Sequence, residues 1–154
     1  MFDYNRGAKA GGVAGIVIGI INAFISLIIL MGLADILSIP KTGFEGAMIT
    51  ALIISAIFSG IIGGVVSGGI FGIIYAAVYN KLPGSTSAMK GLIFAIIYWL
   101  IISAALGYFL SSTYGMTYFI TYNLGFGFVI YIFWGFLTGK LWDRYGGGKE
   151  QPLI

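Results

Sequence analysis

The chain has 154 residues, of which 59% are hydrophobic, and its eight basic and five acidic residues give a formal net charge of +3. Only 8% of the residues are charged, against about a quarter in ordinary soluble domains, so the composition excludes a water-soluble globular protein. The hydrophobicity equally excludes a disordered chain. Cysteine and histidine are absent, which removes thiol chemistry, disulfides and the commonest metal ligand and general base. We therefore predict a polytopic membrane protein.

Four tracts are long and apolar enough to cross a bilayer, whose hydrocarbon core requires roughly 20 residues of helix. They cover about residues 12–32, 46–79, 91–110 and 118–138, and none contains a charged side chain. The connections between them are short, which makes neighbouring helices antiparallel. We predict an all-α bundle of four transmembrane helices in one membrane domain over residues 1–154, with cytoplasmic tails at residues 1–10 and 140–154.

The second tract is longer than a bilayer requires. As one helix it would reach about 50 Å, which demands tilt, a protruding end, or a kink near Gly63-Gly64 or Gly68-Gly69. Two short spans are the alternative, with a turn near residues 59–64. That turn would contain no proline, asparagine or charged residue to hold it at the headgroups. We therefore favour a single long or kinked helix.

The loop charges predict the orientation. With four spans, seven of the eight basic residues lie on one side of the membrane and only Lys41 lies on the other. The seven are Arg6, Lys9, Lys81, Lys90, Lys140, Arg144 and Lys149. With five spans the ratio falls to six to two and the N-terminus moves outside. The positive-inside rule favours four spans with both termini in the cytoplasm, and we expect a multi-pass protein of the cell membrane.

Small residues form rows along the apolar tracts. The first row is Ala8, Gly12, Gly15, Gly19, Asn22 and Ser26, and the second is Gly60, Gly64, Gly68, Gly72 and Ala76. In the fourth tract the row includes Gly135 and Gly139. Lipid gives helices little hydrophobic reason to associate, so close packing of small residues drives their contact. Two interpretations stay open: the first helix packs on the second, or a row faces another protomer at an oligomer interface or a pore.

Six polar or aromatic residues within the spans are candidates for contact with a solute. They are Asn22, Tyr98, Trp99, Asn123, Tyr131 and Trp134. An amide in hydrocarbon must find partners, so Asn22 is expected to link helices unless it touches a solute. The aromatic residues either fill the space that glycines leave or line a cavity for an apolar or cationic ligand.

One segment resembles a family of small, uncharacterised prokaryotic membrane proteins, many of them archaeal. The residues that carry this resemblance are Phe71-Gly72, Tyr75, Leu82-Pro83-Gly84, Lys90-Gly91 and Trp99. The resemblance implies no activity, because none is assigned to those proteins.

The distribution of polar residues disfavours several functions. Spans without charge disfavour a proton pump or a voltage sensor, and acidic residues scattered over both sides disfavour an enzyme. We expect a non-enzymatic structural or accessory subunit that packs through its glycine rows against itself or a membrane partner. We expect no catalytic residue, metal site, cofactor or nucleic-acid partner. The alternative is a small oligomeric channel or transporter for a small solute, which an internal similarity between the two halves and the deep Asn22 would suit.

Overall fold

A computed structural model of the chain describes residues 3–33, 46–114, 116 and 119–146. Every regular element in this part of the chain is helical, which confirms the predicted all-α class. The elements are α1 (Tyr4–Leu33), α2 (Gly46–Val78), the short 3₁₀ helix η1 (Tyr79–Lys81), α3 (Ser87–Tyr114), the π-helix η2 (Phe119–Gly127) and α5 (Phe128–Tyr145). Three of the four long helices are apolar enough over a sufficient length to cross a membrane, and Ser87–Ser103 in α3 is a shorter apolar stretch.

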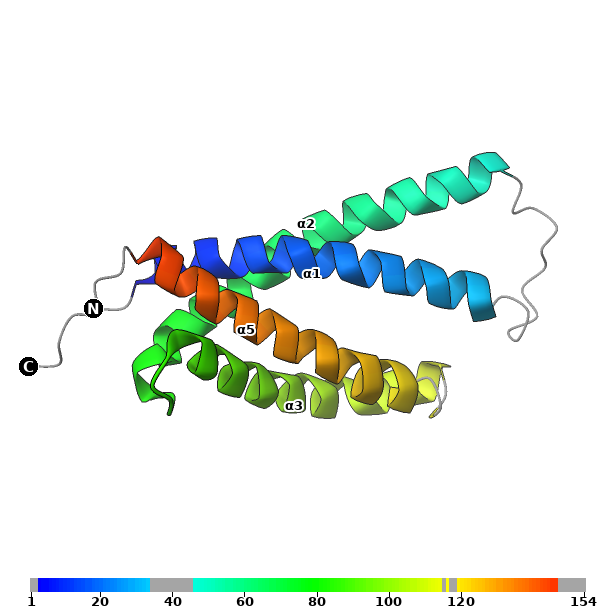
Figure 1. Cartoon of the computed structure of the whole chain (residues 1–154). Coiled ribbons are helices and arrows are strands. Elements are labelled where there is room, and N and C mark those ends of the chain that lie inside the picture. Colours follow the sequence, from blue (N-terminus) through cyan, green and yellow to red (C-terminus); the bar gives the residue numbers. More distant parts are fainter. Residues whose placement is uncertain (1–2, 34–45, 115, 117–118, 147–154) are drawn as a thin grey trace, which may run out of the picture.

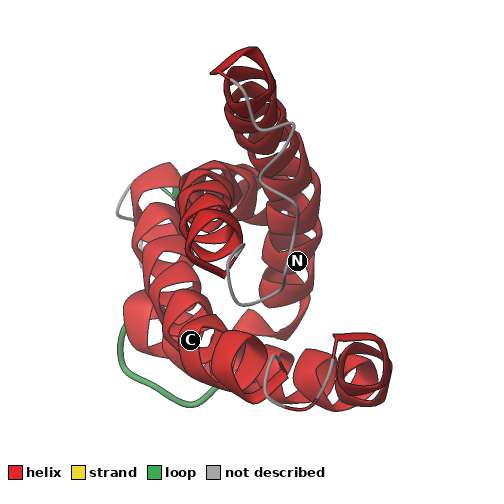
Figure 2. Cartoon of the chain, turned by 90° about the vertical axis from the view of Figure 1, so that its right-hand side faces the viewer, coloured by secondary structure: helices red, strands yellow, loops and turns green. Residues whose placement is uncertain are grey.

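The long helices form two antiparallel pairs. Helix α1 packs along α2, α3 packs along α5, and α1 also contacts α5 (Figure 1). Helix α1 begins and α5 ends at the same end of the molecule at which η1 leads from α2 toward α3. The two pairs lie close together at this end and separate toward the other, which faces the viewer in Figure 2.

We call the first of these ends the basic end. Among the described residues, six of the cations that the sequence placed on one side of the membrane lie here. They lie in the first turns of α1 and α3, in η1 and in the last turns of α5: Arg6, Lys9, Lys81, Lys90, Lys140 and Arg144. Lys41 and Lys149 lie outside the described residues.

The predicted tails are in part helical, so the helices continue beyond the apolar tracts. Helix α1 begins at Tyr4 and α5 continues to Tyr145, so residues 4–10 and 140–145 extend the helices. The physical reason is that charged residues oppose insertion into lipid but do not oppose helix formation outside it. The Asp3 carboxylate also caps α1, because its Oδ1 accepts a hydrogen bond from the backbone N–H of Arg6 at 3.0 Å.

Helix α2 is one element of 33 residues. Residues 59–64 are helical throughout, so the alternative of two spans with a turn there is wrong. The chain leaves α2 through η1 and turns at Gly84, whose φ of 131° is a conformation that L side chains rarely adopt. Helix α3 then starts with Thr86 Oγ1 accepting the backbone N–H of Met89 at 3.2 Å.

The core lies toward the basic end. Its buried residues are Ala10, Ala14, Ile18, Phe71, Tyr75, Ala76, Phe94, Ala95, Trp134 and Trp142. Phe71 joins the two helix pairs, because its ring stacks on Trp134 at 4.5 Å and meets Tyr98 edge-on at 5.1 Å between centroids. An aromatic core of this kind fills the space between helices whose backbones are farther apart than those of α1 and α2.

Candidate functional site

Helices α1 and α2 touch backbone to backbone through a ladder of glycines. Four glycines of α1 face four of α2 in antiparallel order: Gly7 with Gly72, Gly11 with Gly68, Gly15 with Gly64, and Gly19 with Gly60. A Cβ atom added to any of these eight would overlap the backbone carbonyl oxygen of the facing glycine. The ladder therefore requires glycine at every step, and it uses the glycine row of α2 inside the chain.

The α1 side of this ladder differs from the row that the sequence suggested. Gly7 and Gly11 take part, whereas Gly12 does not, because the nearest atom to a Cβ at Gly12 is the Val65 carbonyl oxygen at 4.0 Å. A strict four-residue row on α2 packs best against a strict four-residue row on α1. Pairs of this kind cross at an angle of roughly 40–50°. This accounts for the separation of α1 from α2 toward the end opposite the basic end (Figure 1).

Helices α3 and α5 make a shorter contact of the same kind. Gly91 faces Gly135, and a Cβ atom at either would overlap the other's carbonyl oxygen. Gly139 lies against the backbone of Ser87 and Ala88. The predicted packing residues Gly135 and Gly139 thus lie between helices of the same chain, as the glycines of α2 do.

At the basic end, a series of stacked side chains connects α1, α5, η1 and α3. The Arg6 guanidinium of α1 lies 4.3 Å from the Trp142 ring of α5, and that ring stacks on Tyr79 at 4.8 Å. The Lys90 ammonium of α3 lies 4.2 Å from the Tyr79 ring, directly after α2. Hydrogen bonds reinforce the series, since Tyr79 Oη and Ser87 Oγ are 2.6 Å apart. This end of the molecule is consequently the better-connected one.

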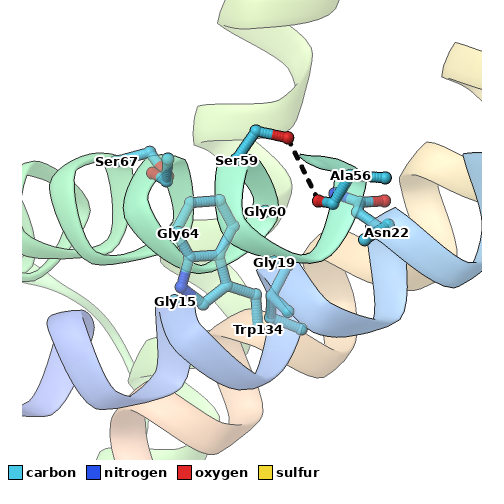
Figure 3. A pocket seen from close by; sticks show the side chains of 12 residues that line it. Gly15, Gly19, Asn22, Ala56, Ser59, Gly60, Gly64, Ser67 and Trp134 are labelled. Carbon is cyan, nitrogen blue, oxygen red and sulfur yellow. Dashed lines mark hydrogen bonds between the residues drawn. The ribbon is translucent and has the colours of Figure 1, made fainter. Parts of the chain in front are cut away.

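A groove with a volume of about 420 Å³ begins where α1 and α2 separate. It is lined by Gly15, Ile18, Gly19, Asn22, Ala23, Ala56, Ser59, Gly60, Gly63, Gly64, Ser67 and Trp134. We call it the inter-helix groove. Figure 3 shows the Trp134 ring reaching from α5 toward Gly64, and Asn22 farther along α1 past Gly19.

Few polar groups line the groove, and they differ in whether their hydrogen-bond donors are already used within the protein. Ser59 donates to the Ala56 carbonyl oxygen at 3.1 Å, and Ser67 donates to that of Gly63 at 2.6 Å. Their hydroxyl protons are therefore satisfied within α2. The Trp134 side chain is only 6% exposed, and its Nε1 has no hydrogen-bond partner among the described residues. Because this nitrogen is itself buried, the donor that an incoming molecule can reach in the groove is the amide of the partly exposed Asn22.

The six predicted solute-contacting residues do not form one site. Asn22 and Trp134 meet at the groove. Trp99 instead donates to the backbone carbonyl oxygen of Asn123 at 3.1 Å, linking α3 to η2. Tyr98 and Tyr131 belong to the aromatic core, with ring centroids 6.0 Å apart.

Sequence reasoning missed one row of the groove. Ser59, Gly63 and Ser67 follow one another at every fourth position of α2, and all three are exposed. In the sequence these three residues form a second row of small residues beside the glycine row of α2. The prediction used only the longer glycine row.

Comparisons with known proteins give a family and no activity. The model of the Family of unknown function (DUF6789) matches residues 2–152. Neither a curated protein nor a solved structure matches the chain. The match agrees with the resemblance to an uncharacterised family.

Proposed function

The chain belongs to the Family of unknown function (DUF6789), and from its geometry we propose that it is a non-enzymatic structural or accessory subunit of the cell membrane. Its role is to hold a transmembrane helix, from a second copy or from another membrane protein, in the inter-helix groove. The observation that carries this proposal is the exposed row of Ser59, Gly63 and Ser67 along the groove.

The glycine ladder supports this choice of surface. Because the facing glycines of α1 and α2 are in contact with each other, a partner that approached through them would have to separate the two helices. The groove runs over the last two steps of the ladder, Gly15 with Gly64 and Gly19 with Gly60. A Cβ added at Gly63, beside them, would meet no atom within 4 Å. Another backbone can approach α2 closely at this position.

The chemistry of the row favours a helix over a solute. Serine hydroxyls that bond their own helix behave as small side chains rather than as solute ligands. Small residues spaced four apart are the surfaces on which transmembrane helices pack. The Asn22 amide then remains as a donor for an acceptor on the incoming helix.

Two matched glycine variants test the proposal. Gly63 and Gly69 both lie on α2, and an added Cβ meets nothing within 4 Å at either position, so both variants should fold. Gly63 lines the groove and Gly69 does not. Native mass spectrometry in nanodiscs with native lipids should find the wild type and Gly69→Leu with a bound partner or second copy, and Gly63→Leu alone.

Two results would contradict this role. One is a wild-type chain that is strictly monomeric and copurifies with nothing. The other is an equal loss of association in Gly63→Leu and Gly69→Leu, which would mean that added bulk anywhere on α2 disturbs the protein.

A second candidate function is a small channel or transporter. It is favoured by the Asn22 amide in a groove of about 420 Å³ between the helices. Solute flux into proteoliposomes that Asn22→Leu abolishes and Gly69→Leu leaves intact would favour it. The absence of flux over a broad panel of solutes and ions would end it.

A further inference from the structure

A second, smaller hollow lies at the basic end and has a volume of about 210 Å³. It is lined by Asp3, Asn5, Arg6, Lys9 and Tyr145, and we call it the basic notch. Its residues come from the start of α1 and the end of α5. Two stretches that are long and apolar enough to span a membrane, Tyr4–Ile25 and Asn123–Tyr145, begin and end at these same places. If those helices cross a bilayer, the notch lies at the level of the lipid headgroups.

The Arg6 side chain is held in place by α5. Its Nε donates to the Trp142 carbonyl oxygen at 2.6 Å, and the guanidinium lies 4.3 Å from the Trp142 ring centroid. One of the five N–H donors of the guanidinium is thus used. The terminal nitrogens lie against Gly146, where an added Cβ atom would overlap them. A cation with a fixed orientation loses little side-chain entropy when it binds an anion.

The charges of the notch favour an anion. Arg6 and Lys9 supply two cations against the single carboxylate of Asp3. That carboxylate already accepts the backbone N–H of Arg6 at 3.0 Å. Phosphate is the anion that such a pair suits best, because arginine binds its oxygens through paired donors and lysine adds a point charge.

The surface of α1 beside the notch changes from polar to apolar along one row. Asn5, Lys9, Val13 and Val17 follow one another at every fourth position, and all four are exposed. Val13 and Val17 are 39% and 38% exposed. Residues four apart lie on one face of a helix, so this row offers polar contacts at its start and apolar contacts deeper along α1. That order matches an amphiphile with its headgroup in the notch.

We propose that the basic notch binds the phosphate of an anionic membrane phospholipid, whose acyl chain lies along Val13 and Val17. The general attraction of basic residues to anionic leaflets supplies part of the affinity for the lipid. The N–H donors of Arg6, which α5 holds in place, add to this affinity. This site is separate from the inter-helix groove and does not depend on the proposed accessory role.

Lipid retention measured by native mass spectrometry tests the proposal. The purified full chain is equilibrated with equal amounts of phosphatidylglycerol and phosphatidylcholine, and the bound lipids are counted. We expect the wild type to retain more phosphatidylglycerol, and we expect Lys9→Gln to lower this retention about fivefold. Lys140→Gln is the matched control, because Lys140 is an exposed cation at the same end that does not line the notch.

Each other outcome overturns the site. Equal retention of the two lipids by the wild type would show that the notch does not select an anionic headgroup. Equal losses in Lys9→Gln and Lys140→Gln would show a diffuse attraction to the basic end. Displacement of the lipid by millimolar inorganic phosphate would show that free phosphate, and not a lipid, is the ligand. Since Gly63→Leu leaves the notch unchanged, failure here is distinguishable from failure of the proposed function.

Discussion

At the scale of single residues, the missing side chain of glycine is what brings α1 and α2 together. At Gly64 a Cβ would overlap the Gly15 carbonyl oxygen, whereas at Gly63, the preceding residue of α2, it would meet nothing within 4 Å. The same residue type therefore has opposite requirements at adjacent positions. Backbone atoms cannot rotate away from a new methyl group as a side chain can, so relief of the overlap requires the helices to separate.

We predict that Gly15→Ala destabilises the protein by about 1–3 kcal/mol, the usual cost of inserting a methyl group into a well-packed contact. Reversible unfolding in detergent micelles measures the change. Gly63→Ala is the control, because its methyl group meets open space and alanine favours a helix more than glycine does. A Gly15→Ala variant as stable as Gly63→Ala would show that the ladder is looser than described.

At the scale of elements, the π-helix η2 is the part of the fold that hydropathy did not indicate. The fourth tract was predicted as a plain helix over residues 118–138, but Phe119–Gly127 is π-helical before α5 begins. The Trp99 indole N–H bonds the Asn123 carbonyl oxygen at 3.1 Å, and Ser103 Oγ donates to Asn123 Oδ1 at 3.4 Å. Insertion of side-chain groups into the backbone ladder is a common cause of such irregular turns.

We predict that Trp99→Phe loosens η2 without unfolding α5. The variant keeps an aromatic ring beside Phe128, whose centroid lies 4.8 Å from that of Trp99, but it loses a hydrogen bond whose net contribution is about 1 kcal/mol. Hydrogen exchange measured by mass spectrometry should become faster over residues 119–127. Residues 136–145 serve as the internal control, and faster exchange there as well would point to a general loss of packing instead.

At the scale of the whole molecule, side-chain contacts join the helices at the basic end, and the two helix pairs lie apart at the other end. Arg6, Trp142, Tyr79 and Lys90 link α1, α5, η1 and α3 at one end. The helix pairs separate toward the other end (Figure 1). Tyr75 and Trp142 are 0% and 5% exposed, and their rings meet edge-on at 5.5 Å between centroids, so α2 is joined to α5 at the basic end as well.

We predict that the basic end faces the cytoplasm. Because the chain has no cysteine, Ser85→Cys and Met116→Cys each introduce one thiol, the first after η1 and the second just beyond α3 at the opposite end. A membrane-impermeant maleimide should label Met116→Cys in intact cells and Ser85→Cys in inverted vesicles, as the positive-inside rule requires. Labelling of both thiols from the same side would refute the four-span topology.

The sequence by itself determined the helical class, and it favoured one long or kinked helix over residues 46–79. These depend on hydropathy, charge and spacing, which act along one stretch of chain. It also contained the four-residue glycine spacing of α2, although it left open whether that row would face α1 or another protein. Tertiary structure decided that Gly11 rather than Gly12 faces α2, that Asn22 and Trp134 share a groove, and that Trp99 bonds the backbone of η2. Each of these depends on the angle at which two helices cross and on what the facing helix presents, and no local pattern encodes either.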